Sequence, residues 1–63
     1  MTQDLEELRA DVSRTMTKIY VLAAEVQQHP ARLGQMLRGR LPMPVEVYDR
    51  VAEALARRRS AAG

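Results

Sequence analysis

The apolar positions of the first part of the chain follow the spacing of an α-helix. Steps of three and four residues separate these positions in the segment 4–26, which contains neither glycine nor proline. Such spacing is helical and close to the heptad seam of a coiled coil. It predicts either one long helix over residues 4–26 that dimerises along the seam, or two shorter helices. The series consists of Leu5, Leu8, Val12, Ile19, Leu22 and Val26. Between Val12 and Ile19, the position where the spacing calls for an apolar residue is taken by Thr15, with Met16 beside it.

Three hydroxyl residues between positions 13 and 17 favour the interpretation with two helices. In that case the first helix ends near Arg14, and Thr15 or Thr17 caps a second helix that starts near Lys18. Nothing in the segment forces a break. The continuous helix and the broken helix therefore both remain open.

Glycine and proline divide the rest of the chain. A turn is expected at residues 27–29, and Pro30 suits the first position of a new helix, where its missing N–H is not needed. This helix is predicted to run to Arg38, with Gly39 ending it in a left-handed conformation. A connector with two prolines follows at residues 41–44, where continuous helix is excluded.

A final helix is expected from Pro44 or Val45 to about Arg58. Its apolar face is formed by Val47, Val51 and Leu55, with Tyr48 and Ala52 beside them. The sequence thus predicts an all-α fold of three or four helices. Its segments are an N-terminal helix for the core or for dimerisation (1–16), a helix-turn-helix region with the C-terminal helix (17–58), and a flexible tail (59–63).

The length of 63 residues limits the chain to one small domain. A domain of this size buries only about 60% of the surface that its unfolded chain exposes. Because cysteine is absent, neither disulfides nor zinc–thiolate sites can support the core, and helix packing and self-association remain. No apolar run approaches the roughly 20 residues that span a bilayer, and no secretory signal is apparent. We therefore expect a cytoplasmic protein without a membrane partner.

Charge is distributed unevenly along the chain, although the net charge is only +2. Residues 1–14 carry a net −2, residues 15–43 a net +3, and residues 44–63 a net +1. Positive charge is therefore densest in the predicted helix-turn-helix region. A basic surface is the electrostatic requirement for binding nucleic acid phosphates.

The polar face of the helix that starts at Pro30 carries the side chains best suited to read DNA. Arg32 matches guanine O6 and N7, and Gln35 matches adenine N6 and N7. Arg38 and Arg40, near the end of the helix, are better placed for phosphates, which fix position without reading sequence. The expected DNA-binding residues are Lys18, His29, Pro30, Ala31, Arg32, Gly34, Gln35, Arg38 and Arg40.

Residues 18–56 resemble the lambda-repressor/Cro-type helix-turn-helix family. The resemblance rests on four elements, which are Leu22-Ala23, the turn at Gln27 before His29-Pro30, Leu37-Arg38-Gly39, and Leu41-Pro42-Met43-Pro44. It implies a transcriptional regulator of the repressor type found in phages and mobile elements. Such a protein binds double-stranded operator DNA as a homodimer and uses no cofactor.

Three positions depart from the family pattern. Gln27 stands where glycine is common, which predicts either a positive φ at this residue or a different turn. His29 replaces the usual serine or threonine cap. Lys18 stands where a capping hydroxyl commonly opens the first helix of the motif, which keeps the continuous-helix alternative open.

Two alternative functions use the same residues differently. An excisionase-like architectural protein would bend DNA with the same helix. An interaction protein would instead form a coiled coil over residues 4–26 and would not bind DNA.

Catalytic and metal-dependent functions find little support in the residue types present. No nucleophile–base pair and no glycine-rich phosphate loop is present, so an enzyme is not expected, and neither is a small-molecule ligand. His29 is the only histidine and has no cysteine to join it at a metal. The remaining candidates have structural roles. Met16, Met36 and Met43 are expected in the core, and Arg57, Arg58 and Arg59 form either a solvated helix end or a secondary phosphate contact.

Overall fold

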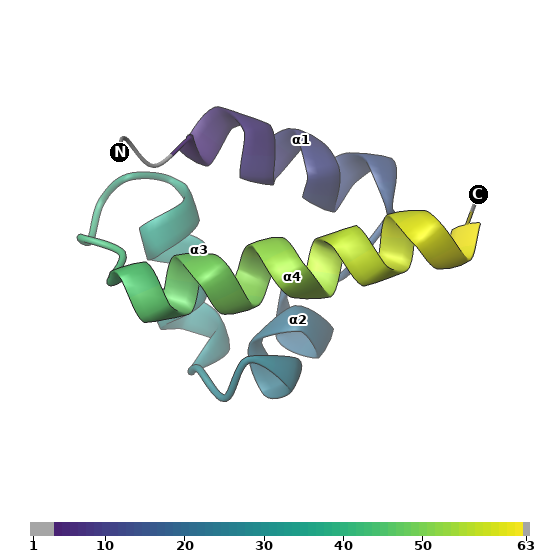
Figure 1. Cartoon of the computed structure of the whole chain (residues 1–63). Helices are drawn as coiled ribbons and strands as arrows, with labels where there is room; N and C mark the ends of the chain where they lie inside the picture. The colour runs from purple at the N-terminus through teal and green to yellow at the C-terminus, as the bar shows by residue number, and fades with distance from the viewer. Residues whose placement is uncertain (1–3, 63) are drawn as a thin grey trace.

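Four helices and their short connections make up residues 4–62, the part of the chain that the computed structural model describes (Figure 1). The helices are α1 (Leu5–Arg14), α2 (Ile19–Glu25), α3 (Pro30–Leu37) and α4 (Val45–Ala62). No strand occurs in these residues, which confirms the predicted all-α fold. Residues 1–3 of the predicted N-terminal segment and Gly63 of the predicted tail lie outside the described residues.

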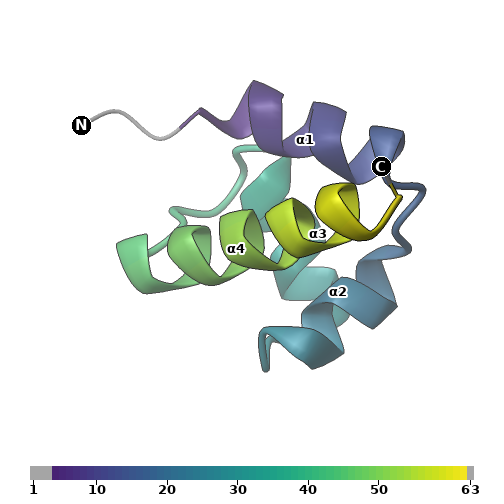
Figure 2. The same cartoon turned by 45° about the vertical axis from the view of Figure 1, so that its right-hand side comes forward.

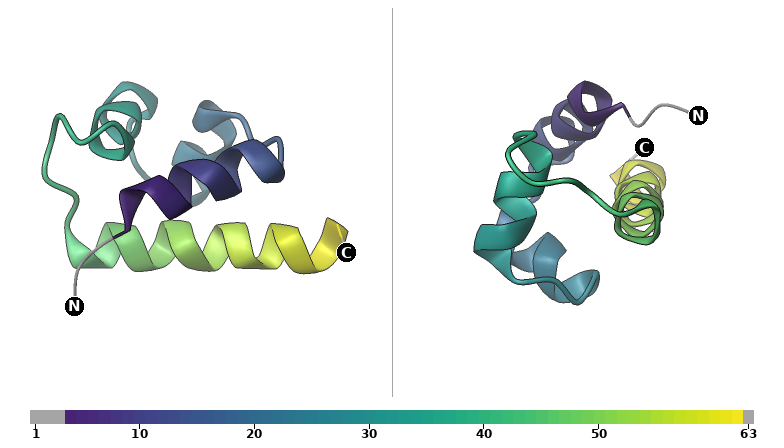
Figure 3. Two further views of the ribbon diagram at one scale, coloured as in Figure 1. Left: turned by 90° about the horizontal axis from the view of Figure 1, so that it is seen from above. Right: turned by 90° about the vertical axis from the view of Figure 1, so that its left-hand side faces the viewer.

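The longest helix, α4, forms one side of the molecule. Helix α1 packs against α4 and α3, and α2 packs against α3 and α4. Figure 2 shows α1 and α2 on either side of α4. The right-hand view of Figure 3 looks along α4 and shows α3 on the opposite side of the molecule. One face of α3 is therefore turned away from every other helix.

The core is made of apolar side chains from all four helices and from the connector before α4. Leu22, Leu33, Val51 and Leu55 have no measurable exposed surface. Burying one such side chain stabilises the fold by about 1.5–3 kcal/mol. The buried apolar residues are Leu8, Leu22, Ala23, Val26, Leu33, Met36, Leu37, Met43, Val47, Val51, Ala54 and Leu55.

A left-handed residue closes each of the first three helices. Met16 (φ 53°), Gln27 (φ 60°) and Gly39 (φ 80°) stand two positions after the last residue of their helix. The N–H of the next residue donates to a carbonyl five positions back, which is the Schellman arrangement. These bonds are Thr17 N to Val12 O (3.1 Å), Gln28 N to Ala23 O (2.8 Å) and Arg40 N to Gln35 O (2.9 Å).

The break after Arg14 settles the architecture of the N-terminal half. The prediction of two helices is confirmed, and the continuous helix over residues 4–26 is wrong. Leu8, Leu22 and Val26, which would have formed the seam of a coiled coil, are buried in the core of this chain. The coiled-coil alternative loses its basis, because its seam is already covered.

The predicted threonine cap of α2 is wrong. The Thr15 hydroxyl donates back to Asp11 O at 2.7 Å and lies 2.7 Å from the Thr17 hydroxyl, so both serve the end of α1. The N-cap position of α2 is Lys18, whose side chain makes no capping hydrogen bond. Both hydroxyls therefore belong to the C-terminal end of α1, where the Asp11 carbonyl accepts from the backbone N–H of Thr15 as well as from its hydroxyl.

Met16 also corrects the predicted core. Met36 and Met43 are buried as predicted, whereas Met16 is 88% exposed. The left-handed turn at Met16 takes the residue out of the helical series and directs its side chain to solvent.

The predicted end of α4 near Arg58 is wrong as well, because the helix continues to Ala62. Ion pairs to two other helices are made at and just before this additional turn. Arg57 and Arg58 reach Glu25 on α2 at 3.2 and 2.5 Å, and Arg59 reaches Asp11 on α1 at 3.7 Å. The arginine run therefore connects three helices, a role that differs from both predicted alternatives.

Candidate nucleic-acid interface

Helices α2 and α3, joined by residues 26–29, form a helix-turn-helix. Ala23 lies fully buried on α2, where its small side chain allows α3 to approach closely. Leu22 on α2, Val26 directly after it, and Leu33, Met36 and Leu37 on α3 face the core as predicted. The apolar face of α3 is thus held by packing, and its other face is free for contacts outside the chain.

The turn and the start of α3 agree with the sequence prediction. Gln27 takes a positive φ, which is one of the two alternatives that the sequence left open, and His29 is the N-cap, with its Nδ1 accepting a hydrogen bond from Ala31 N at 3.2 Å. Pro30 occupies the first helical position. This arrangement fixes where α3 begins and which residues face outward.

The outward face of α3 carries short, amide and guanidinium side chains. At 100° per residue, Ala31, Gln35 and Arg38 lie opposite the buried Leu33, Met36 and Leu37, and all three are exposed. Arg32 and the half-buried Gly34 lie on the two flanks of this face. We call the set Ala31, Arg32, Gly34, Gln35 and Arg38 the outer face of α3.

The chain segment that contains the outer face has no acidic residue to oppose its positive charge. Residues 26–43 contain no aspartate or glutamate. The preceding acid, Glu25, is engaged by Arg57 and Arg58 on α4. Within residues 4–62, none of the observed ion pairs involves Arg32, Arg38 or Arg40. Their charge is available to an anionic partner.

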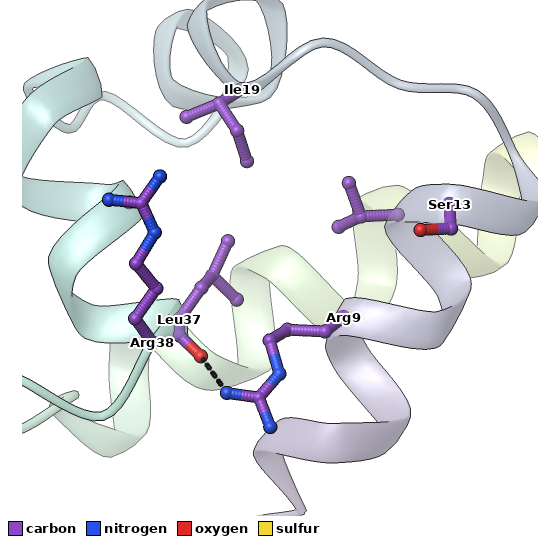
Figure 4. Close-up of a pocket in the computed structure, with 7 residues that line it drawn as sticks. Arg9, Ser13, Ile19, Leu37 and Arg38 are labelled. Carbon is purple, nitrogen blue, oxygen red and sulfur yellow. Dashed lines mark hydrogen bonds between the residues drawn. The ribbon is translucent and has the colours of Figure 1, made fainter.

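A hollow of about 210 Å³ adjoins the outer face between α1, α2 and α3 (Figure 4). Arg9 on α1 donates through Nη1 to Leu37 O at 3.0 Å and so caps the end of α3. Arg38 lines the same hollow from the end of α3, and Ile19 lines it from α2. The floor is aliphatic and the rim is cationic. The lining residues are Arg9, Val12, Ser13, Ile19, Gly34, Leu37 and Arg38.

The hollow is open at Gly34. A Cβ built at this glycine would meet no atom within 4 Å, so packing inside the chain does not require a glycine there. An aliphatic floor with guanidinium groups at the rim suits deoxyribose and phosphate, whose surfaces are apolar and anionic respectively.

The remaining predicted site residues lie around this centre. Lys18 is exposed, with its Nζ 5.9 Å from the centre of the Tyr20 ring, and it directly precedes Ile19 of the hollow. Arg40 is exposed in the turn after α3. Sequence reasoning missed Arg9 and Ser13. They belong to α1, and only the packing of α1 on α3 brings them to the site.

Among residues 4–62, no group of three histidine, cysteine or acidic side chains is arranged to hold a metal ion. In the same residues, no helix has both the length and the apolar character needed to cross a membrane. Comparisons with models of protein families, with characterised proteins and with solved structures find no match for this chain. The fold defines its class as a four-helix all-α domain that contains a helix-turn-helix.

Proposed function

We propose that this protein is a sequence-specific regulator of transcription that binds double-stranded operator DNA as a cytoplasmic homodimer. The observation that carries the proposal is the outer face of α3. It is exposed, cationic and turned away from the rest of the molecule, and no acidic residue lies in the segment 26–43 that contains it.

The dimensions of α3 suit the major groove. An α-helix with its side chains is about 10–12 Å across, and the major groove, which is about 12 Å wide, admits it. Gln35 at the centre and Arg32 on one flank are the side chains that would read base edges. Arg38 and Arg40 would hold phosphates together with the rim of the hollow, which adds Arg9 and Ser13 to the interface.

Fluorescence anisotropy with labelled duplexes tests the proposal. The probes are duplexes from the DNA flanking the gene, and a shuffled duplex of equal composition is the competitor. We expect saturable binding that a specific duplex displaces far better than the shuffled one, by a factor of about 10³ or more. A chain that binds neither duplex at low salt would refute every DNA-binding function.

A matched pair of variants assigns the binding to α3. Arg38→Ala should weaken binding, whereas Arg50→Ala should leave it unchanged, because Arg50 is exposed on α4, which forms the opposite side of the molecule. A bend angle from circularly permuted probes separates the regulator from the excisionase-like alternative, which requires a strong bend.

A further inference from the structure

A second hollow, of about 340 Å³, lies between the helix-turn-helix, the connector before α4 and the first turn of α4. Arg32 lines it from α3, whereas Gly34 and Arg38 line the hollow of Figure 4, so the two hollows lie on opposite flanks of α3. Besides Arg32, the polar lining residue is Gln28. The apolar lining residues are Met36, Leu41, Pro42, Pro44 and Val47. Apolar walls with few polar groups, in a hollow of about 300 Å³ or more, are typical of sites for small ligands.

A second arginine, Arg50, lies on α4 one turn after Val47 of the hollow. At 100° per residue, Arg50 is about 60° round the helix from Val47. The two acids of the first two turns, Glu46 and Asp49, are about 100° and about 160° from Val47. Side chains of a helix also lean toward its N-terminus, which directs Arg50 back toward Val47. The charged residue of these turns that is nearest the hollow is therefore basic.

Contacts further along α4 place Arg50 on the side of the helix where the hollow lies. Arg57 follows Arg50 by two turns on the same side of α4. It reaches Glu25, the last residue of α2, at 3.2 Å. The turn that follows α2 contains Gln28, which lines the hollow. The hollow is thus bordered by Arg32 on α3 and by Arg50 on α4.

The charges of these two arginines are not neutralised by the acids nearby. Arg32 and Arg50 are both exposed, and neither takes part in an ion pair observed within residues 4–62. Glu53, the acid that follows Arg50 on α4, pairs with Arg57 at 3.7 Å. Two guanidinium groups beside apolar walls are complementary to a molecule with an anionic group and an apolar body.

We propose that this hollow binds a small organic anion with an apolar body, such as an aromatic or medium-chain carboxylate, and that the bound anion displaces DNA. A guanidinium group can hold a carboxylate through two parallel hydrogen bonds. The apolar walls cover the body of the ligand, whereas a phosphate ion would leave them exposed. Sequence reasoning did not indicate such a ligand, because only the fold brings Val47 of α4 to the same hollow as Arg32 of α3.

The anion and the operator compete for Arg32. The proposed function assigns Arg32 to a base edge, and one guanidinium group cannot hold the base and the carboxylate at the same time. The ligand must therefore weaken DNA binding, and DNA must weaken ligand binding by the same factor. This displacement rests on the proposed function, whereas binding of the anion does not.

Titration of the whole chain with small carboxylates in the absence of DNA tests the site. The methyl NMR resonances of Met36 and Val47 report binding. The probes are 3-phenylpropionate, hexanoate and octanoate, and the controls are the neutral 3-phenylpropionamide and inorganic phosphate. We expect at least one carboxylate to bind with a dissociation constant below about 1 mM, and both controls to bind at least about tenfold more weakly. The absence of saturable binding by all three carboxylates up to about 10 mM, or equal binding of either control, would overturn the proposal.

A matched pair of arginine variants separates ligand binding from DNA binding. Arg50→Ala should weaken carboxylate binding at least about fivefold and leave DNA affinity unchanged. Arg38→Ala, on the other flank of α3, should weaken DNA binding and leave carboxylate binding unchanged. Carboxylate binding that is unchanged in Arg50→Ala, with circular dichroism showing intact helices, would exclude Arg50 from the site and overturn the proposed recognition of the anion.

Anisotropy with a specific duplex at constant ionic strength tests the displacement. A saturating carboxylate should lower the DNA affinity of the wild type at least about tenfold, and Arg50→Ala should require more carboxylate for the same effect. A wild type that binds carboxylate and DNA independently would overturn the displacement. A chain that binds the carboxylate but no duplex would support the ligand site and refute only the proposed function.

Discussion

Strained backbone is concentrated at the turns that shape the helix-turn-helix. Of the three left-handed residues, only Gly39 is glycine, and Met16 and Gln27 adopt a conformation that disfavours side chains. For residues with a Cβ this conformation costs about 1–2 kcal/mol. The free energy of unfolding of a small domain is low. Strain at these two positions therefore lowers it by a measurable fraction.

Replacing Gln27 by glycine should stabilise the protein. The strain at φ 60° is removed, and the larger entropy loss of glycine offsets part of the gain, which leaves about 0.5–1 kcal/mol. Urea unfolding followed by circular dichroism measures the change. The control is Gln28→Gly, because Gln28 is the adjacent glutamine and its φ is not positive. Equal stabilisation by both variants would contradict the strain at Gln27.

Gly34 and Gly39 should respond oppositely to alanine. At Gly34 the added methyl meets nothing within 4 Å inside a helix, so stability should rise by about 0.5–1 kcal/mol. At Gly39 the φ of +80° should make alanine destabilising by about 1–2 kcal/mol.

Gly34→Ala should nevertheless lower DNA affinity, because the methyl stands where the DNA backbone would approach the hollow. A more stable Gly34→Ala with undiminished DNA affinity would remove Gly34 from the interface.

The side chains of the outer face should divide into two functional groups. Arg32→Ala and Gln35→Ala should each reduce discrimination between operator and shuffled DNA by about 1–3 kcal/mol. Arg38→Ala should weaken the binding of both duplexes alike. It should also reduce the slope of log affinity against log salt concentration by about one. Anisotropy titrations at several salt concentrations measure both quantities. Identical behaviour of all three variants would show that the assigned roles are wrong.

Sequence patterns indicated several residue roles at this scale, including the positive φ of Gln27 as one of two alternatives and His29 as a residue of the turn or cap. Both follow from local chemistry, since a turn of this length requires a left-handed residue and a helix start requires an acceptor. Met16 could not be placed in the same way. Its side chain faces solvent because the chain breaks after α1. The hydroxyl residues in the sequence favoured such a break but did not require it.

Among the helices, α4 depends most on contacts distant in the sequence. Glu25, with its side chain one-third exposed, joins the end of α2 to Arg57 and Arg58. On α1, the buried Asp11 lies within 3.7 Å of Arg59. The two acids hold the last turns of α4 against the other helices.

Glu25→Gln should loosen the end of α4. Loss of the charge that faces two arginines should cost about 1 kcal/mol, the upper range for partly exposed pairs. Hydrogen exchange should quicken in the last turn of α4. Glu53→Gln is the control, because Glu53 is 72% exposed and pairs only with Arg57 on its own helix. The difference in stability between the two variants should become smaller in concentrated salt, because salt screens ion pairs. Unchanged exchange in Glu25→Gln would contradict the role of these ion pairs.

The positions of the helices could be predicted from apolar spacing, glycine and proline, but their ends could not all be. The start of α3 at Pro30 and its end before Gly39 follow from local signals. The end of α4 at Ala62 lies just beyond arginines whose ion pairs with Glu25 span more than 30 residues, and local sequence signals do not show such contacts. Likewise, Arg9 reaches the end of α3 only through tertiary packing, so sequence periodicity gave no indication of its place in the interface.

Over the whole molecule, the internal ion pairs and the free charges lie in different places. Among residues 4–62, Arg57, Arg58 and Arg59 form ion pairs with acids of other helices, whereas Arg32, Arg38 and Arg40 form none. A net charge of only +2 therefore conceals a cationic surface on the side opposite α4. A surface of this kind favours an anionic partner and makes its affinity depend strongly on salt.

Titration of isotopically labelled protein with a specific duplex, followed by the amide NMR spectrum, tests the central claim most directly. We predict that the resonances that shift or broaden belong to the outer face of α3, to Arg40 and to the rim of the adjoining hollow. The exposed side of α4, at Asp49 and Glu53, should remain unperturbed. Perturbations centred on α4, or none at low salt, would contradict DNA binding by α3.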